Sequence, residues 1–395
     1  MFVLVANLGS TSFKYRLFDM TSEKLLARGA VERIGSPISK ATAQVGEQRQ
    51  EREIHAPDHA VAVTLCLQQL VEMGALPSAD QLAAIGFKAV HADGVSGVQL
   101  VTEEVLRAME AFSDVAPAHN PPYIAAMRLL ARELPHIPLV AAFETGFHET
   151  IPPENRFYAV PQEWYHQYGI RRWGFHGASH RYIAGRTAEL LNNPAAKIIS
   201  CHLGGSSSLC AIHNGKSLAN SLGMSPQTGL PHNNRVGDFD PFALPVLMRR
   251  TGRSLEEILK DLASRSGLLG LCGSNDLRDI EARATNGDES AKLAIDVFVA
   301  AIRHYLGAYL LMMNGADAIV FTGGIGENSA LIRSLVCRNL DWFGIYLDEE
   351  KNNTMRGEGT IHQPTSRVAL WIMPTNEEII VARQAADILS KRGVP

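Results

Sequence analysis

Short apolar runs and longer amphipathic stretches alternate along the chain, and this pattern predicts alternating strands and helices. Continuous apolar runs at 2–6, 139–143 and 318–322 predict buried strands, whereas apolar and polar side chains alternate at 13–18 as in a half-buried strand. Further strands are predicted at 82–91, 197–201, 209–213, 216–221 and 368–373, and helices at 59–73, 121–133, 181–191, 288–313 and 377–391. Such an alternation is typical of an α/β fold.

Two similar turns rich in glycine and serine interrupt this pattern. The first reads Asn7-Leu8-Gly9-Ser10-Thr11-Ser12 and the second reads His202-Leu203-Gly204-Gly205-Ser206-Ser207-Ser208. Each turn lies between two predicted strands, so the unit of strand, turn and strand occurs twice. Because small residues leave backbone N–H groups uncovered and serine adds hydroxyl donors, such turns can surround a phosphate. The duplication predicts a phosphate bound from two sides.

Length and composition narrow the class of protein. The 395 residues are too many for one ordinary core and favour two domains. Lys and Arg number 37 against 41 for Asp and Glu, and no basic run indicates a nucleic-acid surface. The five cysteines are scattered without a C-x-x-C pair, and their odd number argues against a disulfide framework. We therefore expect a cytoplasmic protein whose partner is a small molecule.

No targeting or membrane segment is expected. The apolar run at 1–6 lacks a basic flank and is too short for a signal peptide. No stretch approaches the ~20 apolar residues that a membrane-spanning helix needs. The sequence therefore predicts a soluble protein that is not exported.

The run Gly323-Gly324-Ile325-Gly326-Glu327-Asn328 is predicted to be a turn from the strand at 318–322 into another helix. It matches the first half of the dinucleotide fingerprint. However, Ser329 occupies the place of the third glycine and the run lies near the end of the chain, which argues against that motif. Such a turn can instead approach the anionic part of a nucleotide at a helix N-terminus. The alternative is a turn that only packs a helix against a strand.

Two histidines, His176 and His180, are four residues apart, a spacing that on a helix would suggest a metal site. The intervening Gly177-Ala178-Ser179 and the lack of a nearby third ligand argue against a metal. We expect His176 to lie in a loop and face a ligand, and His180 to be a structural histidine. Ser179 is expected to cap the helix at 181–191.

Charged residues in loops and at strand ends provide further candidates. Arg235 lies in the long loop 226–241, where its planar guanidinium could bind a carboxylate or a phosphate. A solvated loop charge is an equally simple interpretation. Asn7, Glu144 and Glu377 each follow an apolar strand. Such oxygen donors suit Mg²⁺, which usually takes one or two carboxylates and keeps several waters.

Taken together, these segments resemble the acetate kinases, within the superfamily of sugar kinases, heat-shock chaperones and actin. The resemblance covers the whole chain. It rests on Asn7-x-Gly9-Ser10-x-Ser12-x-Lys14-Tyr15, Val90-His91, Pro117-x-His119-Asn120-Pro121, Phe147-His148, Gly174-Phe175-His176-Gly177-x-Ser179-His180, Cys201-His202-Leu203-Gly204, Asn214-Gly215-Lys216-Ser217, Arg235-x-Gly237-Asp238-x-Asp240-Pro241, Phe321-Thr322-Gly323-Gly324-Ile325-Gly326-Glu327-Asn328 and Thr375-Asn376-Glu377-Glu378. Many matches in order identify the family far better than any single motif.

The resemblance implies two duplicated ribonuclease H-like domains of the actin-like ATPase type, with nucleotide and acid bound in a cleft between them. The first domain is expected at 1–147 and is joined by a C-terminal helix at 379–395. The second, at 148–378, is expected to bind ATP or ADP and to form a homodimer.

The resemblance also implies roles for individual residues. Arg235 would bind the carboxylate and, with His176, stabilise the phosphoryl group in transfer, and Lys88 and Glu144 complete the expected catalytic set. Asn7 and Glu377 would hold Mg²⁺. The acid would contact Lys88, Val90, His119, Phe175, Pro226 and Arg235, with Val90, Phe175 and Pro226 around its methyl group. The nucleotide and its phosphates would contact Ser10, Ser12, Lys14, His202, Gly204, Gly205, Gly323, Gly324, Gly326 and Asn328.

Several positions differ from the family's pattern. Lys88 replaces an arginine, which keeps the charge but loses bidentate recognition of a carboxylate, and Glu144 replaces an aspartate. The two changes can compensate each other, because a longer acid and a shorter-reaching base can keep a salt bridge. Gly205 and the pair Asn233-Asn234 also depart from the pattern. Another acyl acceptor, slower turnover or lost activity are the alternatives.

The main hypothesis is an ATP- and Mg²⁺-dependent kinase that makes acetyl phosphate or a similar acyl phosphate. A carboxylate is already ionised at pH 7, so this reaction needs positioning and no general base. The alternatives are a catalytically weakened relative that binds a nucleotide or an acyl phosphate as a sensor, a kinase for a different small acid, and, more distantly, a sugar kinase.

Overall fold

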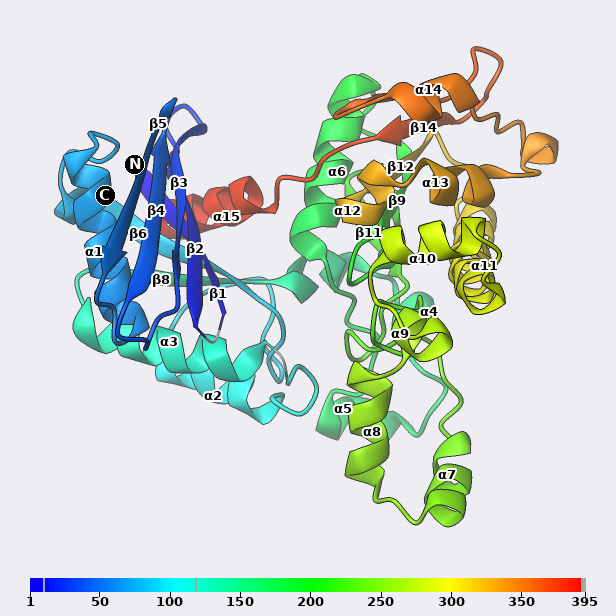
Figure 1. Ribbon diagram of the computed structural model, residues 1–395, viewed down its shortest axis with the longest axis horizontal. Coiled ribbons are helices and arrows are strands. Elements are labelled where there is room, and N and C mark those ends of the chain that lie inside the picture. The colour runs from blue at the N-terminus through cyan, green and yellow to red at the C-terminus, as the bar shows by residue number, and fades with distance from the viewer. Residues whose placement is uncertain (10, 118, 392–395) are drawn as a thin grey trace. The chain divides into compact units, whose positions relative to one another are not determined.

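The computed structural model describes residues 1–9, 11–117 and 119–391. It divides the chain into two compact units, which Figure 1 shows. Unit 1 comprises Met1–Gly146 and Asn376–Pro395, and unit 2 comprises Phe147–Thr375. These boundaries lie slightly before those expected from the sequence, after 147 and after 378. Each unit combines helices with a sheet, so the predicted α/β class is confirmed.

Unit 1 contains an eight-stranded sheet in the order β5-β4-β3-β2-β1-β6-β8-β7. The strands are β1 (Phe2–Leu8), β2 (Ser12–Asp19), β3 (Lys24–Glu32), β4 (Ser39–Val45), β5 (Gln48–Ile54), β6 (Leu82–Ala89), β7 (Val98–Leu100) and β8 (Leu139–Phe143). β1 pairs antiparallel with β2 and parallel with β6, and β6 pairs parallel with β8. The parallel strands therefore end at one edge of the sheet, where open α/β sheets bind ligands.

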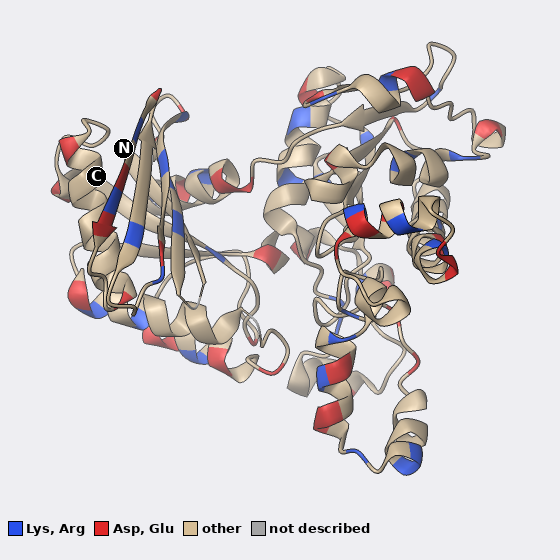
Figure 2. Cartoon of the chain, viewed as in Figure 1, with Lys and Arg blue, Asp and Glu red and all other residues tan. Residues whose placement is uncertain are grey.

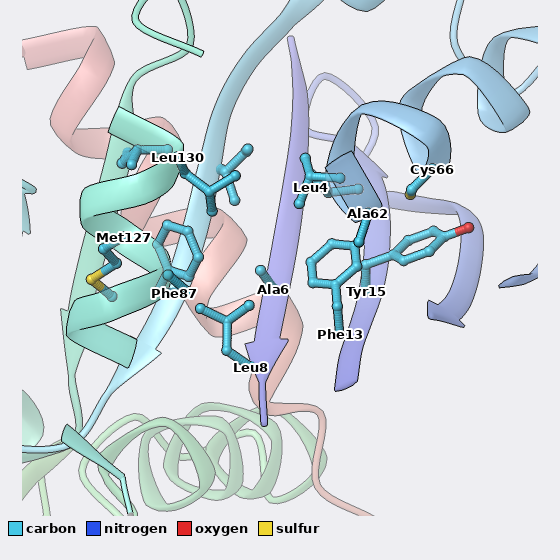
Figure 3. Packing of buried hydrophobic residues seen from close by; sticks show 14 of the residues in the cluster. Leu4, Ala6, Leu8, Phe13, Tyr15, Ala62, Cys66, Phe87, Met127 and Leu130 are labelled. Carbon is cyan, nitrogen blue, oxygen red and sulfur yellow. The ribbon is translucent and has the colours of Figure 1, made fainter. Parts of the chain in front are cut away.

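The core of unit 1 lies between this sheet and the helices that follow its strands. These helices are α1 (His59–Glu72), η1 (Ala79–Gln81), α2 (Glu103–Ala111), α3 (Asn120–Glu133) and, at the unit boundary, η2 (Glu144–Thr150). Figure 3 shows part of this core, formed by Leu4, Ala6, Leu8, Phe13, Tyr15, Ala62, Cys66, Phe87, Met127 and Leu130. The alternating side chains of β2 contribute to this core, because Phe13 and Tyr15 are buried whereas Lys14 between them is exposed.

The C-terminal helix α15 (Glu377–Lys391) packs against β1 and β6. Gly86 of β6 makes room for it, since a Cβ at this position would lie 3.0 Å from Val381 Cγ1. Gly86 precedes Phe87, which points into the core, so α15 covers the opposite face of the sheet. This packing brings Glu377 into unit 1.

Unit 2 contains a six-stranded sheet in the order β11-β10-β9-β12-β14-β13. The strands are β9 (Lys197–His202), β10 (Ser208–His213), β11 (Lys216–Asn220), β12 (Ala318–Thr322), β13 (Gly359–Thr360) and β14 (Ala369–Ile372). The helices are α4 (Pro153–Arg156), α5 (Gln162–Tyr168), α6 (Gly177–Leu190), α7 (Ala243–Thr251), α8 (Leu255–Ser264), α9 (Gly267–Cys272), α10 (Leu277–Thr285), α11 (Glu289–Met312), α12 (Gly323–Asn328), α13 (Ala330–Cys337), η3 (Asp341–Phe343) and α14 (Glu349–Thr354).

The two sheets share one topology. In each, a first strand pairs antiparallel with a second, the second pairs antiparallel with a third, and the first pairs parallel with a fourth strand that pairs parallel with a fifth. In unit 2 these strands are β9, β10, β11, β12 and β14. Each Gly/Ser turn joins the first strand to the second. The predicted duplication is therefore present in the fold.

Most predicted elements are confirmed, and two details are wrong. The helix predicted at 181–191 begins earlier, at Gly177, because the chain enters α6 from a left-handed residue, His176. The run 323–328, predicted as a turn, forms the short helix α12. At the predicted hairpin, Asn214 and Gly215 both have positive φ, of 53° and 68°, as a two-residue hairpin turn requires.

The helix α11 is the long apolar helix of unit 2, with 24 residues. Among the described residues it is the one helix that is long and apolar enough to cross a membrane by length and composition alone. The expectation that no stretch approaches this length is therefore wrong. Phe298 and Ile302 of α11 belong to the core of unit 2, so one face of the helix packs within this unit.

Candidate active site

Three charged side chains of unit 1 meet beyond the end of β6. Lys88 Nζ lies 2.5 Å from Glu377 Oε2 and 3.9 Å from Glu144 Oε1. β6 and β8 are parallel and end at the same edge, and Glu144 directly follows β8. A salt bridge between Lys88 and Glu144, one of the possibilities that the two exchanged residues left open, is present in the structure. The contact with Glu377 was not predicted.

The two carboxylates keep Lys88 charged. Burial lowers the pKa of Lys88, but the negative charges of Glu377 and Glu144 outweigh burial, and the pKa is raised above its ordinary value. Glu144 is only 5% exposed, so its carboxylate is almost removed from water. A carboxylate in such a place requires compensating charge or hydrogen bonds, and the Lys88 ammonium supplies part of this compensation.

Asn7 reaches the same sheet edge as Lys88. The last pair of the ladder between β1 and β6 is Ala6 with Phe87, so Asn7 and Lys88 follow on neighbouring parallel strands and point to the same face. On its other side Asn7 pairs with Lys14 of β2, and both residues line a pocket of about 320 Å³. Unit 1 thus gathers amide, carboxylate and ammonium groups at one edge.

The first Gly/Ser turn is tight. Gly9 N donates to Ser12 O at 2.8 Å, and a Cβ on Gly9 would lie 2.5 Å from Ser12 Oγ, so the Ser12 side chain would have to move for any larger residue at position 9. His59 Nε2 of α1 lies 2.9 Å from Gly9 O and ties the turn to the helix. Ser10, predicted to contact phosphate, lies outside the described residues.

In unit 2, His176 precedes α6 with φ 57° and ψ 32°, a left-handed conformation that few non-glycine residues adopt. Backbone strain of this kind is typical of functional sites. His176 Nδ1 lies 2.8 Å from Ser208 Oγ, and its ring stacks on His202 with 4.3 Å between centroids. Ser179 does not cap the helix as expected. Because Ser179 lies inside the helix, its Oγ contacts His202 Nδ1 at 2.8 Å instead.

His180 is buried and both of its ring nitrogens contact serines. Nδ1 lies 2.9 Å from Ser200 Oγ and Nε2 lies 2.8 Å from Ser208 Oγ. Burial lowers the pKa of His180 well below its ordinary value, and His148 and His202 lower it further. His180 is therefore neutral, and its complete burial agrees with the interpretation as a structural histidine.

Arg235 lies in the loop between β11 and α7, and no carboxylate of the described residues forms an ion pair with it. Its Nη1 donates to Pro226 O at 2.7 Å. Burial lowers the pKa of Arg235 to about 10, so the side chain is still a cation near pH 7. A half-buried guanidinium that lacks a carboxylate partner is well suited to bind an anion.

Backbone contacts hold the Arg235 loop against the connection between α8 and α9. Ser266 N donates to Asn234 O at 3.1 Å. Gly267 has φ 60°, and a Cβ there would collide with His232 O and lie 2.6 Å from Arg235 O. The close approach therefore requires glycine at 267. Arg235 is presented by a fixed loop.

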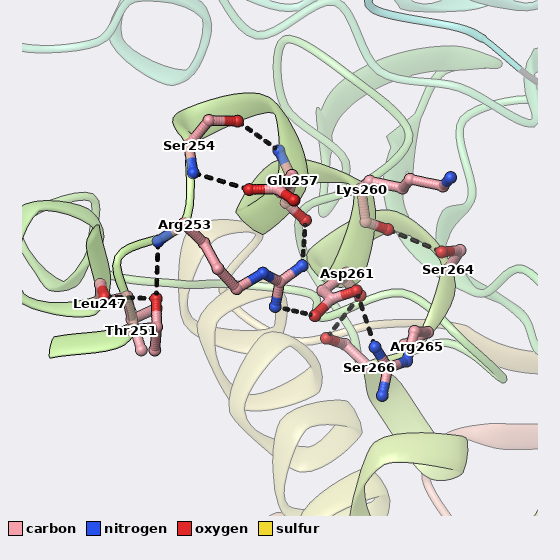
Figure 4. A network of polar contacts seen from close by, with 10 residues as sticks. All are labelled: Leu247, Thr251, Arg253, Ser254, Glu257, Lys260, Asp261, Ser264, Arg265 and Ser266. Atoms are coloured by element: carbon pink, nitrogen blue, oxygen red, sulfur yellow. Dashed lines mark hydrogen bonds and ion pairs between the residues drawn. The ribbon is translucent and has the colours of Figure 1, made fainter.

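A polar network stabilises α8, which leads into this connection (Figure 4). Ser254 and Glu257 form a capping box at its start. At its end, Arg253 Nη1 donates to Asp261 Oδ2 at 2.6 Å, and Ser266 Oγ donates to Asp261 O at 3.0 Å. The connection between α8 and α9, which contacts the Arg235 loop, is thus hydrogen-bonded to α8.

A pocket of about 830 Å³ in unit 2 joins the second Gly/Ser turn to α12. Small and polar residues line much of it, among them Gly204, Gly205, Asn233, Asp276, Gly324 and Asn328. Gly323 has φ 78°, and a Cβ there would lie 2.6 Å from Leu203 O, so glycine is needed where α12 passes the turn. Four residues predicted to contact the nucleotide therefore share this pocket.

His232 connects the second turn to the Arg235 loop. Ser207 N donates to His232 Nδ1 at 2.9 Å, and His232 Nε2 donates to Thr228 O at 3.3 Å. Burial, together with the nearby Arg235, lowers the pKa of His232 to about 3, so this histidine is neutral. The turn and the arginine loop thus form one hydrogen-bonded structure.

The remaining predicted residues are distributed over both units. Ser12, Val90 and His119 belong to unit 1, whereas Phe175, Pro226, His202 and Gly326 belong to unit 2. The predicted methyl pocket of Val90, Phe175 and Pro226 therefore stays a prediction.

Sequence reasoning missed two residues of the site, His232 and Asp276. His232 precedes Arg235 in the same loop, so its proximity to Arg235 was a usable signal. Asp276 lines the pocket and caps α10, where its side chain accepts from Arg278 N at 3.0 Å. An aspartate before an amphipathic stretch is an ordinary helix-start signal that could have been used.

Acidic and basic residues are dispersed along the chain of both units (Figure 2). Within residues 1–9, 11–117 and 119–391, no group of three or more His, Cys, Asp or Glu could hold a metal. The carboxylates of Glu144 and Glu377 and the amide of Asn7 nevertheless have the hard oxygen donors that Mg²⁺ prefers, and Mg²⁺ needs only one or two carboxylates.

The repeated sheets, the glycine turns at strand ends and the arginine beside the pocket define a phosphotransferase of the actin-like ATPase fold. More specifically, the chain belongs to the acetokinase family, whose model matches residues 2–383.

Similar proteins of known structure or name agree with this. An acetate kinase from Bacillus cytotoxicus is 44% identical over 394 residues, with 98% of each chain covered. The crystal structure of Porphyromonas gingivalis acetate kinase has a TM-score of 0.87 at 38% identity and covers 98% of this chain and 99% of its own. A propionate kinase structure from Francisella tularensis has the same TM-score at 34% identity, with 97% and 98% covered.

Proposed function

We propose that this protein transfers the γ-phosphoryl group of ATP to the carboxylate of acetate or a similar short acid, reversibly, to give an acyl phosphate and ADP. The observation that carries the proposal is Arg235. Its guanidinium is half-buried, lacks an ion-pair partner among the described residues, and lies on a loop bonded to the turn that lines the pocket of unit 2. Such a planar cation suits carboxylate and phosphoryl oxygens.

The chemistry needs little covalent assistance. A carboxylate oxygen of the acid attacks the γ-phosphorus, a new O–P bond forms, and the bond to the bridging oxygen of ADP breaks. The acid is ionised near pH 7, so no general base is required. The requirement is to hold the reactants in line and to neutralise the equatorial oxygens. Arg235 and His176 would donate to these oxygens.

Other residues would position the reactants. Lys88, held between Glu144 and Glu377, would orient the acid or its phosphate. His119 and His202 would line the path of the phosphoryl group. Val90, Phe175 and Pro226 would surround the acid's alkyl group. In unit 2, the pocket lined by Gly204, Gly205, Gly324 and Asn328 would bind the nucleotide, with backbone N–H groups toward its phosphates. Gly323 and Gly326 would allow α12 to pack closely.

The turn of unit 1 and the metal complete the proposal. Ser10, Ser12 and Lys14 would contact the phosphates. Asn7 and Glu377, with Glu144 nearby, would hold Mg²⁺ largely through water, as the chemistry of these donors allows. When bound, the ion would neutralise charge on the phosphate oxygens.

We also propose a cytoplasmic homodimer. Unit 2 exposes large apolar side chains that a second copy could cover, including Phe242, Leu311 and Trp342, which are 81%, 80% and 87% exposed. The five cysteines are free and buried, which suits a reducing compartment. Light scattering of the purified protein should give twice the chain mass. A monomer at micromolar concentration would contradict the dimer.

The direct test of function is product formation. Purified protein, ATP and Mg²⁺ should convert acetate or propionate to an acyl phosphate that hydroxylamine traps as the hydroxamate. A panel from formate to butyrate, with ATP, GTP and pyrophosphate as donors, would define the acid and the donor. Tight ATP binding without product from any acid would contradict the proposal and favour a nucleotide sensor.

A further inference from the structure

The backbone around His176 is held from both sides. The residue before it, Phe175, has its carbonyl oxygen bound by His148 Nε2 at 2.8 Å and by Asn220 Nδ2 at 3.2 Å. After it, His180 N donates to His176 O at 2.9 Å and starts α6. These contacts account for the left-handed backbone, and they leave open which ring nitrogen of His176 carries the proton.

The ring nitrogens of His176 belong to a chain of hydrogen bonds. Its Nδ1 contacts Ser208 Oγ, which contacts His180 Nε2, and His180 Nδ1 contacts Ser200 Oγ. The three distances are 2.8, 2.8 and 2.9 Å. Ser200, Ser208 and His180 are completely buried, so each of their protons needs an acceptor within the protein.

The number of protons along this chain of hydrogen bonds determines which group donates in each bond. A neutral His180 has one N–H and one bare nitrogen, and each serine has one O–H. If Ser200 donates to His180 Nδ1, then His180 Nε2 donates to Ser208, and Ser208 donates to His176 Nδ1. Every buried proton then has an acceptor.

The opposite direction leaves a defect. His176 Nδ1 would donate to Ser208, Ser208 to His180 Nε2, and His180 Nδ1 to Ser200 Oγ. The Ser200 hydroxyl proton would then lack an acceptor, because among the described residues Ser200 Oγ has no partner besides His180. Because a buried donor without an acceptor is costly, the first direction is favoured.

We propose that Ser200, His180 and Ser208 form a relay that fixes the tautomer of His176 with its proton on Nε2. The relay residues are positioning residues and do not contact the substrate. The consequence rests on the proposed function: a proton on Nε2 makes this nitrogen a hydrogen-bond donor, which is the state that a phosphoryl oxygen requires of His176. The neutral state of His180 on which the count depends agrees with its complete burial.

The tautomer can be measured independently of activity. Nitrogen NMR of the full-length protein labelled with ¹⁵N-histidine distinguishes protonated from bare ring nitrogens, and a His176→Asn variant assigns the signal. We expect a bare Nδ1 and a protonated Nε2 on His176. Ser208→Ala should give a mixture of both tautomers, and Ser200→Ala should weaken the preference. A proton on Nδ1 in the unmodified protein, or an unchanged tautomer in Ser208→Ala, would overturn the relay.

A matched control separates the relay from general damage. Ser217→Ala removes another buried hydroxyl that contacts a histidine, His148 Nδ1 at 2.8 Å, and should leave the His176 tautomer unchanged. Thermal unfolding of each variant identifies any that fail to fold. In turnover, Ser208→Ala should lower kcat roughly tenfold with little change in the KM for ATP. If the original protein made no acyl phosphate, the proposed function would fail, while the NMR result would still decide the relay.

Discussion

The two units share one sheet topology but place different kinds of side chain beside its strands. In unit 1, β6 ends at a cluster of full charges, in which Lys88 lies between Glu144 and Glu377. In unit 2, the buried hydroxyl groups of Ser200 on β9 and Ser208 on β10 contact histidines, with His176 and His180 both on Ser208. One topology thus supports a cluster of ion pairs in one unit and a network of histidines and serines in the other.

This difference determines which cation is available. Lys88 already has two carboxylate partners, so binding an anion there competes with existing ion pairs. Arg235 has a backbone carbonyl instead of an acid, and the histidine that faces its loop, His232, is neutral. An arriving phosphoryl group would therefore gain most from Arg235. Substitutions at the two sites can test this contrast between a paired and an unpaired cation.

The largest effect is expected at Arg235. Arg235→Ala should lower kcat by about 10³-fold or more, because donors to the transferring phosphoryl group act mainly in the transition state. Arg235→Lys keeps the charge but loses the planar fork, and it should recover only part of the rate. The hydroxamate assay measures both. A variant within threefold of the original rate would remove Arg235 from the mechanism.

The second largest effect is expected when the ion pairs of Lys88 are broken. Lys88→Met leaves Glu144 and Glu377 without their shared cation and should lower the free energy of unfolding by about 2–3 kcal/mol, since Lys88 is partly exposed. Activity should fall roughly 100-fold. Lys88→Arg keeps the charge and should retain most stability. Urea unfolding and steady-state kinetics give the two values; equal stability of Lys88→Met and the original protein would show that the pairs are unimportant.

A smaller and more local effect is expected at the nucleotide pocket. Gly323→Ala places a Cβ 2.6 Å from Leu203 O on a residue with φ 78°. The resulting strain, of order 1–3 kcal/mol, should weaken ADP binding about tenfold or more. Gly185→Ala is the control, because a Cβ there meets no atom within 4 Å. Calorimetric titration with ADP distinguishes them, and equal affinities would place the nucleotide elsewhere.

The pH dependence of stability tests whether the buried His148 of unit 2 is neutral. Burial lowers the pKa of His148 to about 4 from an ordinary value of 6.5. Between these pH values His148 is protonated in the unfolded chain but not in the folded protein. Its contribution to the free energy of unfolding is therefore fully present above about pH 6.5 and falls as the pH drops toward 4. His148 alone contributes on the order of 3 kcal/mol. His148→Gln should flatten the pH profile of urea midpoints by one proton; an unchanged slope would contradict the assignment.

Much of the fold could be predicted because its central elements carry strong local signals. The apolar runs at β8 and β12 and the helix α15 were predicted with their observed bounds. β5 was missed because its sequence, Gln48–Ile54, is mostly charged and polar, so its place at a sheet edge depends on pairing with β4. The early start of α6 was missed because no capping side chain precedes it.

The candidate site was predictable in composition but less so in contacts. Family motifs pointed to Lys88, His176 and Arg235, yet the bond between Lys88 and Glu377 joins residues far apart in the sequence. The clamp of Gly267 on the Arg235 loop likewise depends on tertiary packing. Local sequence carries no signal for such contacts.

The central claim is that Arg235, the cation without an acidic partner, receives the anion. Calorimetric titration of acetyl phosphate into the original protein and into Arg235→Ala tests it most directly. Because a hydrogen bond to a charged group is worth about 1.5–3 kcal/mol, the variant should bind acetyl phosphate at least tenfold more weakly while its affinity for ADP stays within about threefold. Equal affinities of the two proteins for acetyl phosphate would contradict the account.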